Sequence, residues 1–240
     1  ERLNPLRAGF PVCDTVGGLN AAFAVMAALF HRQRTGEGQS IDIALLDSIM
    51  PLMGWVAANL LIGHQQPVLM GNDNFTAAPS GTFRTLDGHI NIAANKQEQW
   101  EAVCDVLALP ELKTDPRFAE RDTRKKNRRD LTALLEEKLV TRTTADWVAG
   151  LNAADVPSGA ILGLEEALRQ PQLAHRDVLK KLPLPGFGDI EVFGLTALFE
   201  KTPGTVETPP PTLGEHNSEV YTALGISADE QTRWKTAGVI

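Results

Sequence analysis

Two long apolar stretches near the start of the chain have the composition of helices. Residues 17–34 are rich in alanine and other apolar side chains, and Gly36 and Gly38 follow them as stop signals. Residues 45–62 form a second apolar stretch, in which Pro51 is expected to introduce a kink. We expect three large side chains of this second helix to pack in a core: Met50, Met53 and Trp55.

Alternation and turn residues predict strands further along the chain. Residues 39–44 alternate polar and apolar side chains, as a half-buried strand does. Asp87 and Gly88 separate two strand-like runs, residues 83–85 and 89–93, and an Asp-Gly pair in that setting is a strong hairpin signal. The apolar periodicity is interrupted at residues 63–79, where turn residues cluster, so we place a domain boundary there.

The remainder of the chain is predicted to alternate short helices and strands. One helix, residues 97–109, places Trp100, Val103 and Cys104 on one face, where Cys104 acts as a small buried residue. Further helices are expected at residues 130–139, after a cap at Thr144, at residues 164–170, in a stretch that ends at Leu224, and at residues 227–235. Strands are expected near residues 155–161 and within residues 180–199. A proline-rich connection is expected at residues 202–212.

Composition is that of an ordinary globular protein. Hydrophobic residues make up 43% of the chain and charged residues 22%. The length of 240 residues is enough for one large domain or two small ones. The net charge of −7 argues against a general nucleic-acid binder. The basic run at residues 121–129 is interpreted as a solvated face at the start of an amphipathic helix.

Cysteine content and targeting signals favour the cytoplasm. Cys13 and Cys104 are too few for a disulfide framework, which makes a reducing compartment the default. We find no signal peptide and no uninterrupted apolar run long enough to span a bilayer, and therefore expect no membrane association. Neither His64 nor the Glu215-His216 pair has enough neighbouring ligands for a metal site, so no metal is expected.

Asp14 is the candidate catalytic residue, and two interpretations of it compete. It precedes Gly17, Gly18 and the first apolar stretch, where an aspartate can cap a helix through the free backbone N–H groups of the first turn. Alternatively, its carboxylate could attack an acyl carbonyl as a nucleophile. Gly17 and Gly18 would then let a substrate approach the backbone, and N–H groups of residues 15–18 would stabilise negative charge.

Residues 11–48 resemble the class III CoA-transferase family, which includes formyl-CoA transferase, carnitine CoA-transferase and the α-methylacyl-CoA racemases. The resemblance is carried by four elements in order: Pro-Val-Cys-Asp with Gly17-Gly18, the helix ending His-Arg-Gln-Arg, then Thr-Gly-Glu-Gly-Gln, then Ser-Ile-Asp-Ile-Ala-Leu-Leu-Asp. The nucleophilic aspartate of the family falls on Asp14. The resemblance therefore implies transfer of CoA between carboxylic acids through an aspartyl-acyl anhydride and an aspartyl-CoA thioester.

The resemblance also implies an α/β fold and a partial one. The chain is similar to the C-terminal part of the family, with long helices from a large domain, a small α+β domain and an interlocked dimer. It implies a large-domain segment at 1–70, a small domain at 71–190 and a return segment at 191–240. The chain begins at Glu1 without Met, as a processed chain or a fragment does. The resemblance favours a fragment, whose missing N-terminal half would supply most CoA contacts.

Residues 78–96 also resemble the part of the family that approaches the active site from the small domain, so Asn95 and Gln97 are candidates for lining the substrate. Some members have a mobile run of glycines before this hairpin, whereas residues 72–78 here contain none. The racemases place an acid/base glutamate just after the hairpin, at the position of Gln97, with Glu98 one residue on. An amide cannot act as a general base, so transfer is favoured and a racemase is the alternative.

The implied partners are an acyl-CoA, a small carboxylic acid and a second copy of the chain, together with the missing half. No cofactor beyond coenzyme A is implied, and a nicotinamide is not, because the chain has no Rossmann fingerprint. A third hypothesis is a half-protein that is inactive until its N-terminal portion is supplied. The identity of the two acids is left open.

Overall fold

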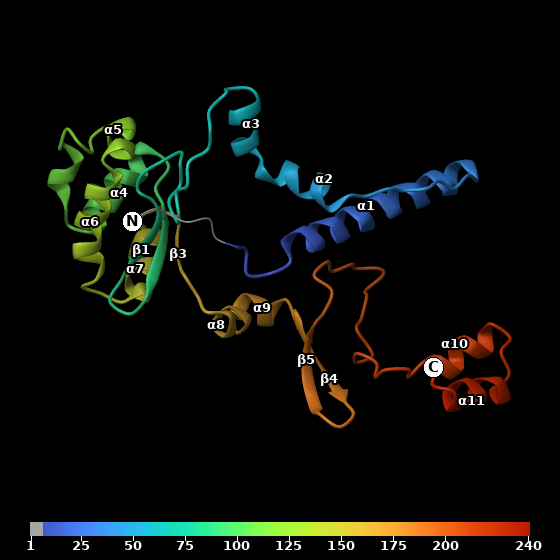
Figure 1. Ribbon diagram of the computed structural model, residues 1–240. Coiled ribbons are helices and arrows are strands. Elements are labelled where there is room, and N and C mark those ends of the chain that lie inside the picture. Colours follow the sequence, from blue (N-terminus) through green and yellow to red (C-terminus); the bar gives the residue numbers. More distant parts are fainter. Residues whose placement is uncertain (1–6) are drawn as a thin grey trace. The chain divides into compact units, whose positions relative to one another are not determined.

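The computed structural model describes residues 7–240, and its contacts divide the chain between Ile161 and Leu162 into two compact units (Figure 1). Helices and small antiparallel sheets alternate in both units, which confirms the predicted α/β class. The main hydrophobic core lies within residues 78–156. We call residues 71–161 of the first unit, which contain this core, the small α+β domain. The predicted division into three segments, at residues 70 and 190, stays a prediction.

The first unit begins with α1 (Val12–Thr35), a helix of 24 residues. It ends because Gly36 adopts a left-handed conformation, with φ of 80°, and donates its N–H to the Arg32 carbonyl at 2.8 Å. Many apolar side chains along α1 are exposed. They include Leu19, Phe23, Met26 and Phe30.

By length and composition, α1 could cross a membrane. The helix is not an uninterrupted apolar run, because Asp14, Thr15 and Asn20 lie within it, and the expected lack of membrane association stays a prediction. Length and composition are weak evidence for insertion, because a core helix of a soluble protein meets the same criteria.

Three short pieces replace the single long helix predicted for residues 45–62. They are α2 (Leu45–Ile49), η1 (Met50–Met53) and α3 (Trp55–Leu61). The helix breaks because Pro51 has no N–H to donate and Gly54 adopts a φ of 52°. Their large side chains are exposed, so the predicted core packing is wrong: Met50 is 49%, Met53 44% and Trp55 51% exposed.

The strand predicted at residues 39–44 is also absent, because the segment runs between α1 and α2 without regular structure. Backbone N–H and C=O groups of a strand need partners on a neighbouring strand. No strand within residues 7–240 pairs with this segment. The side chains of residues 39–44 do alternate, but their backbone has no partner strand within the described residues.

The small α+β domain is built on one antiparallel sheet. Its strands are β1 (Ser80–Arg84), β2 (His89–Ala93) and β3 (Ser158–Ala160), in the order β1-β2-β3. The predicted hairpin is confirmed, and its turn closes with the Thr85 N–H donating to the Gly88 carbonyl at 3.0 Å. At the tip, the Asp87 carboxylate accepts bonds from the N–H and hydroxyl of Thr144, which lowers the pKa of Asp87.

Helices cover this sheet and complete the core (Figure 1). They are α4 (Gln97–Val106), η2 (Pro110–Lys113), α5 (Arg121–Lys126), α6 (Arg128–Leu139) and α7 (Thr144–Ala153). Helix α6 packs against β1, and α7 packs against β2, β3 and α4. The predicted buried face of α4 is confirmed, and its residues join a continuous cluster with Phe83, Ile90, Ile92, Phe118, Leu131, Leu135, Leu139, Trp147, Leu151 and Val156.

The cap of α7 differs by one residue from the prediction. Thr143, not Thr144, is the N-cap residue, and its Oγ1 accepts the N–H of Asp146 at 3.2 Å. Thr144 is the first helical residue, and its N–H and hydroxyl bond to the hairpin tip instead. The two adjacent threonines therefore have different roles, since Thr143 caps α7 and Thr144 holds the hairpin tip.

The second unit contains a hairpin and two pairs of short helices. Its elements are α8 (Leu164–Leu168), α9 (Pro171–His175), β4 (Leu179–Leu184), β5 (Gly188–Phe193), α10 (Asn217–Ala223) and α11 (Ala228–Thr236). The strands predicted around Gly186 and Gly188 are confirmed as one antiparallel pair. The proline-rich residues 202–212 form neither helix nor strand.

The core of the small α+β domain makes a stability prediction. Leu135 on α6 is fully buried, so Leu135→Ala is expected to lower the free energy of unfolding by about 2–5 kcal/mol through lost contacts and a cavity. Urea unfolding followed by tryptophan fluorescence measures the change. Glu137→Ala on the exposed face of the same helix is the control, with an expected change within about 0.5 kcal/mol. Equal effects of the two substitutions would contradict this assignment of the core.

Candidate active site

Asp14 lies inside the first turn of α1 rather than ahead of it. The helix starts at Val12, so Asp14 is its third residue, and Pro11 occupies the N-cap position. No side chain caps this helix end, which makes the predicted capping role of Asp14 wrong. The Asp14 carboxylate is exposed, and no hydrogen bond or ion pair within residues 7–240 engages it.

The backbone around Asp14 leaves donors free, but not those expected from the sequence. Val12 donates its N–H to the Phe10 carbonyl at 2.8 Å, and Thr15 donates to Pro11 at 3.0 Å. Residues 15–18 all lie within the helix, where each N–H bonds to the carbonyl four residues back, so they cannot form the predicted oxyanion site. At this helix start, the N–H groups of Cys13 and Asp14 have no backbone acceptor within the described chain.

A helix start of this kind favours negative charge. The dipoles of a 24-residue helix align to place a partial positive charge at its N-terminus. Free N–H groups there are a general site for anions. A developing oxyanion beside Asp14 would therefore meet both the helix dipole and the donors of Cys13 and Asp14 itself.

The two glycines after Asp14 differ in their surroundings. Gly17 is buried against α2, and a Cβ at this position would come within 2.3 Å of Leu45 Cδ2. Gly18 faces open space, with no atom within 4 Å of such a Cβ. Gly17 therefore has a packing role between α1 and α2, while a substrate-binding role for either glycine stays a prediction.

The other two candidates, Asn95 and Gln97, lie at the start of α4 in the small α+β domain. The Asn95 side chain is exposed, and its backbone N–H donates to Gln99 Oε1 at 3.0 Å. The amide of Gln97 is held within the domain. Its Oε1 accepts from Arg124 at 2.9 Å, and its Nε2 donates to Glu101 at 3.1 Å and to the Ala119 carbonyl at 3.2 Å.

The structure therefore places the candidates in two groups. Asp14, Gly17 and Gly18 lie on α1, whereas Gln97 is the first residue of α4 and Asn95 lies two residues before it. No hydrogen bond or ion pair in the part of the chain that the structure describes joins the two groups. A role for Asn95 and Gln97 in lining the substrate stays a prediction. The bonds of Gln97 show in addition that its amide serves the domain itself.

A cavity of about 520 Å³ opens beside β2, and sequence analysis did not predict it. Aromatic and amide side chains dominate its wall, among them Trp55, Asn59, Asn72, Asn74, Phe75 and Asn91. The Trp55 and Phe75 rings stack with centroids 5.9 Å apart. A flat apolar wall beside several amides suits a small organic molecule with polar groups.

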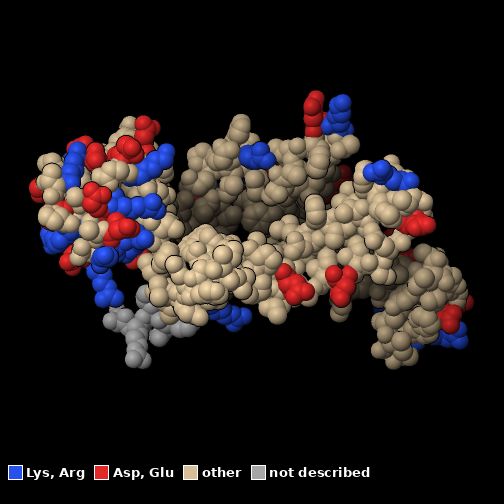
Figure 2. Space-filling model, turned by 90° about the horizontal axis from the view of Figure 1, so that it is seen from above, with Lys and Arg blue, Asp and Glu red and all other residues tan. Residues whose placement is uncertain are grey.

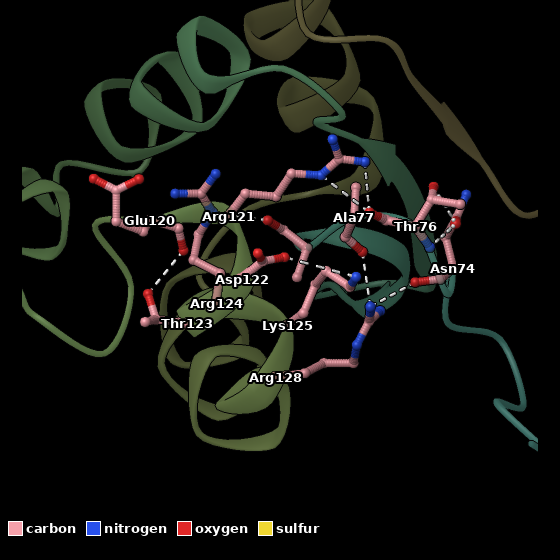
Figure 3. A network of polar contacts seen from close by, with 11 residues as sticks. Asn74, Thr76, Ala77, Glu120, Arg121, Asp122, Thr123, Arg124, Lys125 and Arg128 are labelled. Atoms are coloured by element: carbon pink, nitrogen blue, oxygen red, sulfur yellow. Dashed lines mark hydrogen bonds and ion pairs between the residues drawn. The ribbon is translucent and has the colours of Figure 1, made fainter.

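The basic run at residues 121–129 is the largest departure from expectation at this site. Charged side chains crowd the surface of the small α+β domain (Figure 2), but Arg124 is only 2% exposed. Arg121, Arg124 and Arg128 donate hydrogen bonds to backbone carbonyls of residues 74–80 (Figure 3). The interpretation of the run as a solvated face is therefore wrong for Arg124, which is buried, and for Arg128, which is half-buried. It holds for Arg121, Lys126 and Arg129, which are exposed.

Within residues 7–240, no three His, Cys, Asp or Glu side chains gather as metal ligands would. The chemistry available on the described chain is thus that of a carboxylate at a helix start, amides and the guanidinium groups that hold residues 74–80. A carboxylate in this setting can act as a nucleophile toward acyl groups.

Comparison with known proteins assigns the family. Residues 1–217 match CoA-transferase family III, and the chain belongs to this family. It is 33% identical over 217 residues to the mouse succinyl-CoA:glutarate CoA-transferase, covering 90% of this chain and 50% of that protein. It is 30% identical over 239 residues to the succinyl-CoA–D-citramalate CoA-transferase of Chloroflexus aurantiacus, covering 98% and 59% of the two proteins.

A solved structure agrees with this assignment. The chain superimposes on a CAIB/BAIF family protein from Brucella suis with a TM-score of 0.79 and 31% sequence identity, covering 92% of this chain and 57% of that one. The chain thus spans about half the length of the curated relatives and solved structures that it matches. The resemblance seen in the sequence motifs is confirmed at the level of family and fold.

The two cysteines allow a test of the turn around Asp14. Burial raises the pKa of the Cys104 thiol to about 12, whereas Cys13, next to Asp14, is half-buried. Because the thiolate is the reactive form, iodoacetamide at pH 8 is expected to label Cys13 and to spare Cys104 in the folded chain. Peptide mass spectrometry measures the labelling, and both cysteines should react in denaturant. Equal labelling of the two in the folded chain would contradict the described burial.

Proposed function

We propose that this chain carries the catalytic half of a CoA-transferase and that Asp14 is its nucleophile. The single observation that carries the proposal is an exposed carboxylate in the first turn of a long helix, beside free backbone donors. Family membership supplies the reaction class. The names of the relatives include succinate, glutarate and citramalate, which favours small dicarboxylic acids as substrates.

The proposed reaction divides transfer into steps at one carboxylate. An Asp14 oxygen attacks the thioester carbonyl of the donor acyl-CoA, the carbon–sulfur bond breaks, and an anhydride and CoA thiolate form. The thiolate then attacks the Asp14 carbonyl of the anhydride, which releases the donor acid and leaves an aspartyl-CoA thioester. The acceptor carboxylate repeats these steps in reverse. Each step exchanges one activated acyl bond for another, so no external energy source is needed.

The tetrahedral intermediates of these steps carry an oxyanion. The N–H groups of Cys13 and Asp14, together with the positive end of α1, are the donors proposed to stabilise it. Asp14 would therefore be both the nucleophile and, through its own backbone, part of the stabilising environment. No metal is needed for this charge, because backbone donors and the helix dipole are already present.

Activity is proposed to require more than these 240 residues. The relatives are about twice as long, and the exposed apolar residues of α1 form a surface that another segment or chain would cover. We propose that the N-terminal portion found in the family supplies most contacts to CoA, and that a homodimer completes the site. The assay below therefore uses the chain together with that portion.

The decisive experiment traps the covalent intermediate. The completed enzyme is incubated with succinyl-CoA, trapped with borohydride or hydroxylamine, and digested for mass spectrometry. We expect the label on Asp14, and Asp14→Asn is expected to lose the label and at least about a thousandfold in transfer rate, because the nucleophile is gone. The matched control is Asp229→Asn, since Asp229 also lies in the first turn of a helix, α11.

Other outcomes have distinct meanings. An unlabelled enzyme that exchanges the α-proton of a 2-methylacyl-CoA with solvent deuterium would instead be a racemase. Absence of both signals across several acyl-CoAs would contradict a catalytic role for Asp14.

A further inference from the structure

Three arginines hold one irregular segment of the small α+β domain, residues 73–80 (Figure 3). Of the three, Arg128 makes the most contacts with this segment. Its guanidinium donates to the carbonyls of Asn74 at 2.5 Å, Ala77 at 2.8 Å and Ser80 at 3.3 Å, and lies 3.6 Å from Asp73 Oδ1. One side chain therefore gathers carbonyls from both ends and the middle of the segment.

The other two arginines bind the residues between those points. Arg121 donates from Nε and Nη2 to the Thr76 carbonyl, at 3.1 and 2.7 Å. Arg124 donates from Nε to the Ala78 carbonyl at 3.0 Å. The three cations come from consecutive turns of α5 and α6, so a rigid pair of helices presents them together.

The segment depends on these donors for much of its backbone pairing. Asn74 donates its N–H to the Ser80 carbonyl at 2.9 Å, which closes the loop on itself, and the Asn74 side chain accepts the Thr76 N–H at 2.7 Å. The carbonyls of Thr76, Ala77 and Ala78 point to the arginines instead. Hydrogen bonds from a charged guanidinium are stronger than those between neutral groups, so this arrangement resists opening.

The same segment forms one wall of the 520 Å³ cavity, which Asp73, Asn74, Phe75 and Ser80 line. None of the three arginines is among the residues that line the cavity. Arg128 instead lines a separate surface hollow together with Lys126 and Arg129. The arginines thus hold the wall from outside the cavity, without contact with a molecule bound inside it.

We propose that Arg121, Arg124 and Arg128 are positioning residues that keep residues 73–80 as a fixed wall of the cavity, and that this wall shapes substrate binding. The segment does not open and close as a lid. The second part of the proposal rests on the proposed CoA-transferase function, whereas the first part is a property of the chain alone.

Hydrogen exchange tests the first part on the 240-residue chain. The amides of a peptide covering residues 72–82 are expected to exchange at least about tenfold more slowly than those of residues 204–208, which have no backbone acceptors within the described chain. Arg128→Gln is expected to remove most of this protection, while Arg128→Lys, which keeps the charge but loses the fork of donors, restores part of it. Fast exchange of residues 72–82 in the unmodified chain would overturn the proposal.

Arg129→Gln is the matched control, because Arg129 is the next residue on α6, is exposed and makes no hydrogen bond or ion pair in residues 7–240. It should leave exchange unchanged. Exchange of α4 in every variant reports on the core, so local opening is separated from loss of the fold. If Arg128→Gln unfolds α4 as well, Arg128→Lys takes its place in the test. Residues 72–82 of Arg128→Lys that exchange as slowly as those of the unmodified chain would then overturn the proposal.

Kinetics of the completed enzyme test the second part. Arg128→Gln is expected to raise the KM for the acid or the acyl-CoA about tenfold or more with a smaller change in kcat, because the binding wall is displaced. Labelling of Asp14 by succinyl-CoA should persist. Unchanged KM values despite faster exchange would overturn the role in substrate binding, and a failure of Asp14 labelling in the unmodified enzyme would count against the proposed function alone.

Discussion

The buried guanidinium of Arg124 is the interaction on which the small α+β domain depends. It is 2% exposed, and no carboxylate in the described chain lies within ion-pair distance of it. Burial lowers the pKa of Arg124 from its ordinary value, yet arginine stays protonated in proteins. A buried charge of this kind is tolerated only when its donors are satisfied.

The acceptors of Arg124 join parts of the domain that are far apart in sequence. They are the carbonyls of Ala78, Phe118 and Ala119 and the side chain of Gln97, and the Trp100 ring lies 5.1 Å from the guanidinium carbon. The approach to β1, the start of α4 and the turn before α5 therefore meet at one cation. Loss of any of these partners would leave a buried donor unpaired, so the bond from Arg124 gives Gln97 a structural role in the domain.

Local patterns predicted the elements whose partners are close in sequence. The hairpin around Asp87, helix α4 and the pair β4–β5 follow from turn residues and periodicity within a few positions. The strand predicted at residues 39–44 failed because strand formation depends on a partner that the described chain does not provide. Likewise, the arginine run resembled a solvated face because its acceptors, the carbonyls of residues 74–80, lie about 45 to 54 positions away. The sequence pattern placed Asp14 ahead of α1 because Gly17 and Gly18 suggested a turn, whereas the helix begins at Val12, directly after Pro11.

The charge of Asp14 and the charges of Arg121, Arg124 and Arg128 stand in different surroundings. Asp14 is exposed at a helix start and unpaired within the described residues, so its carboxylate is available for reaction. Arg121, Arg124 and Arg128 donate hydrogen bonds to backbone carbonyls, so their charge helps to fix the backbone. In the proposed mechanism one aspartate meets two different acids in succession, and both must fit the same surroundings. A wall that these arginines hold fixed, as proposed, would not close more tightly on one acid than on the other. Discrimination would then come from the shape and amide groups of a fixed cavity, and not from a closure that each acid would have to induce.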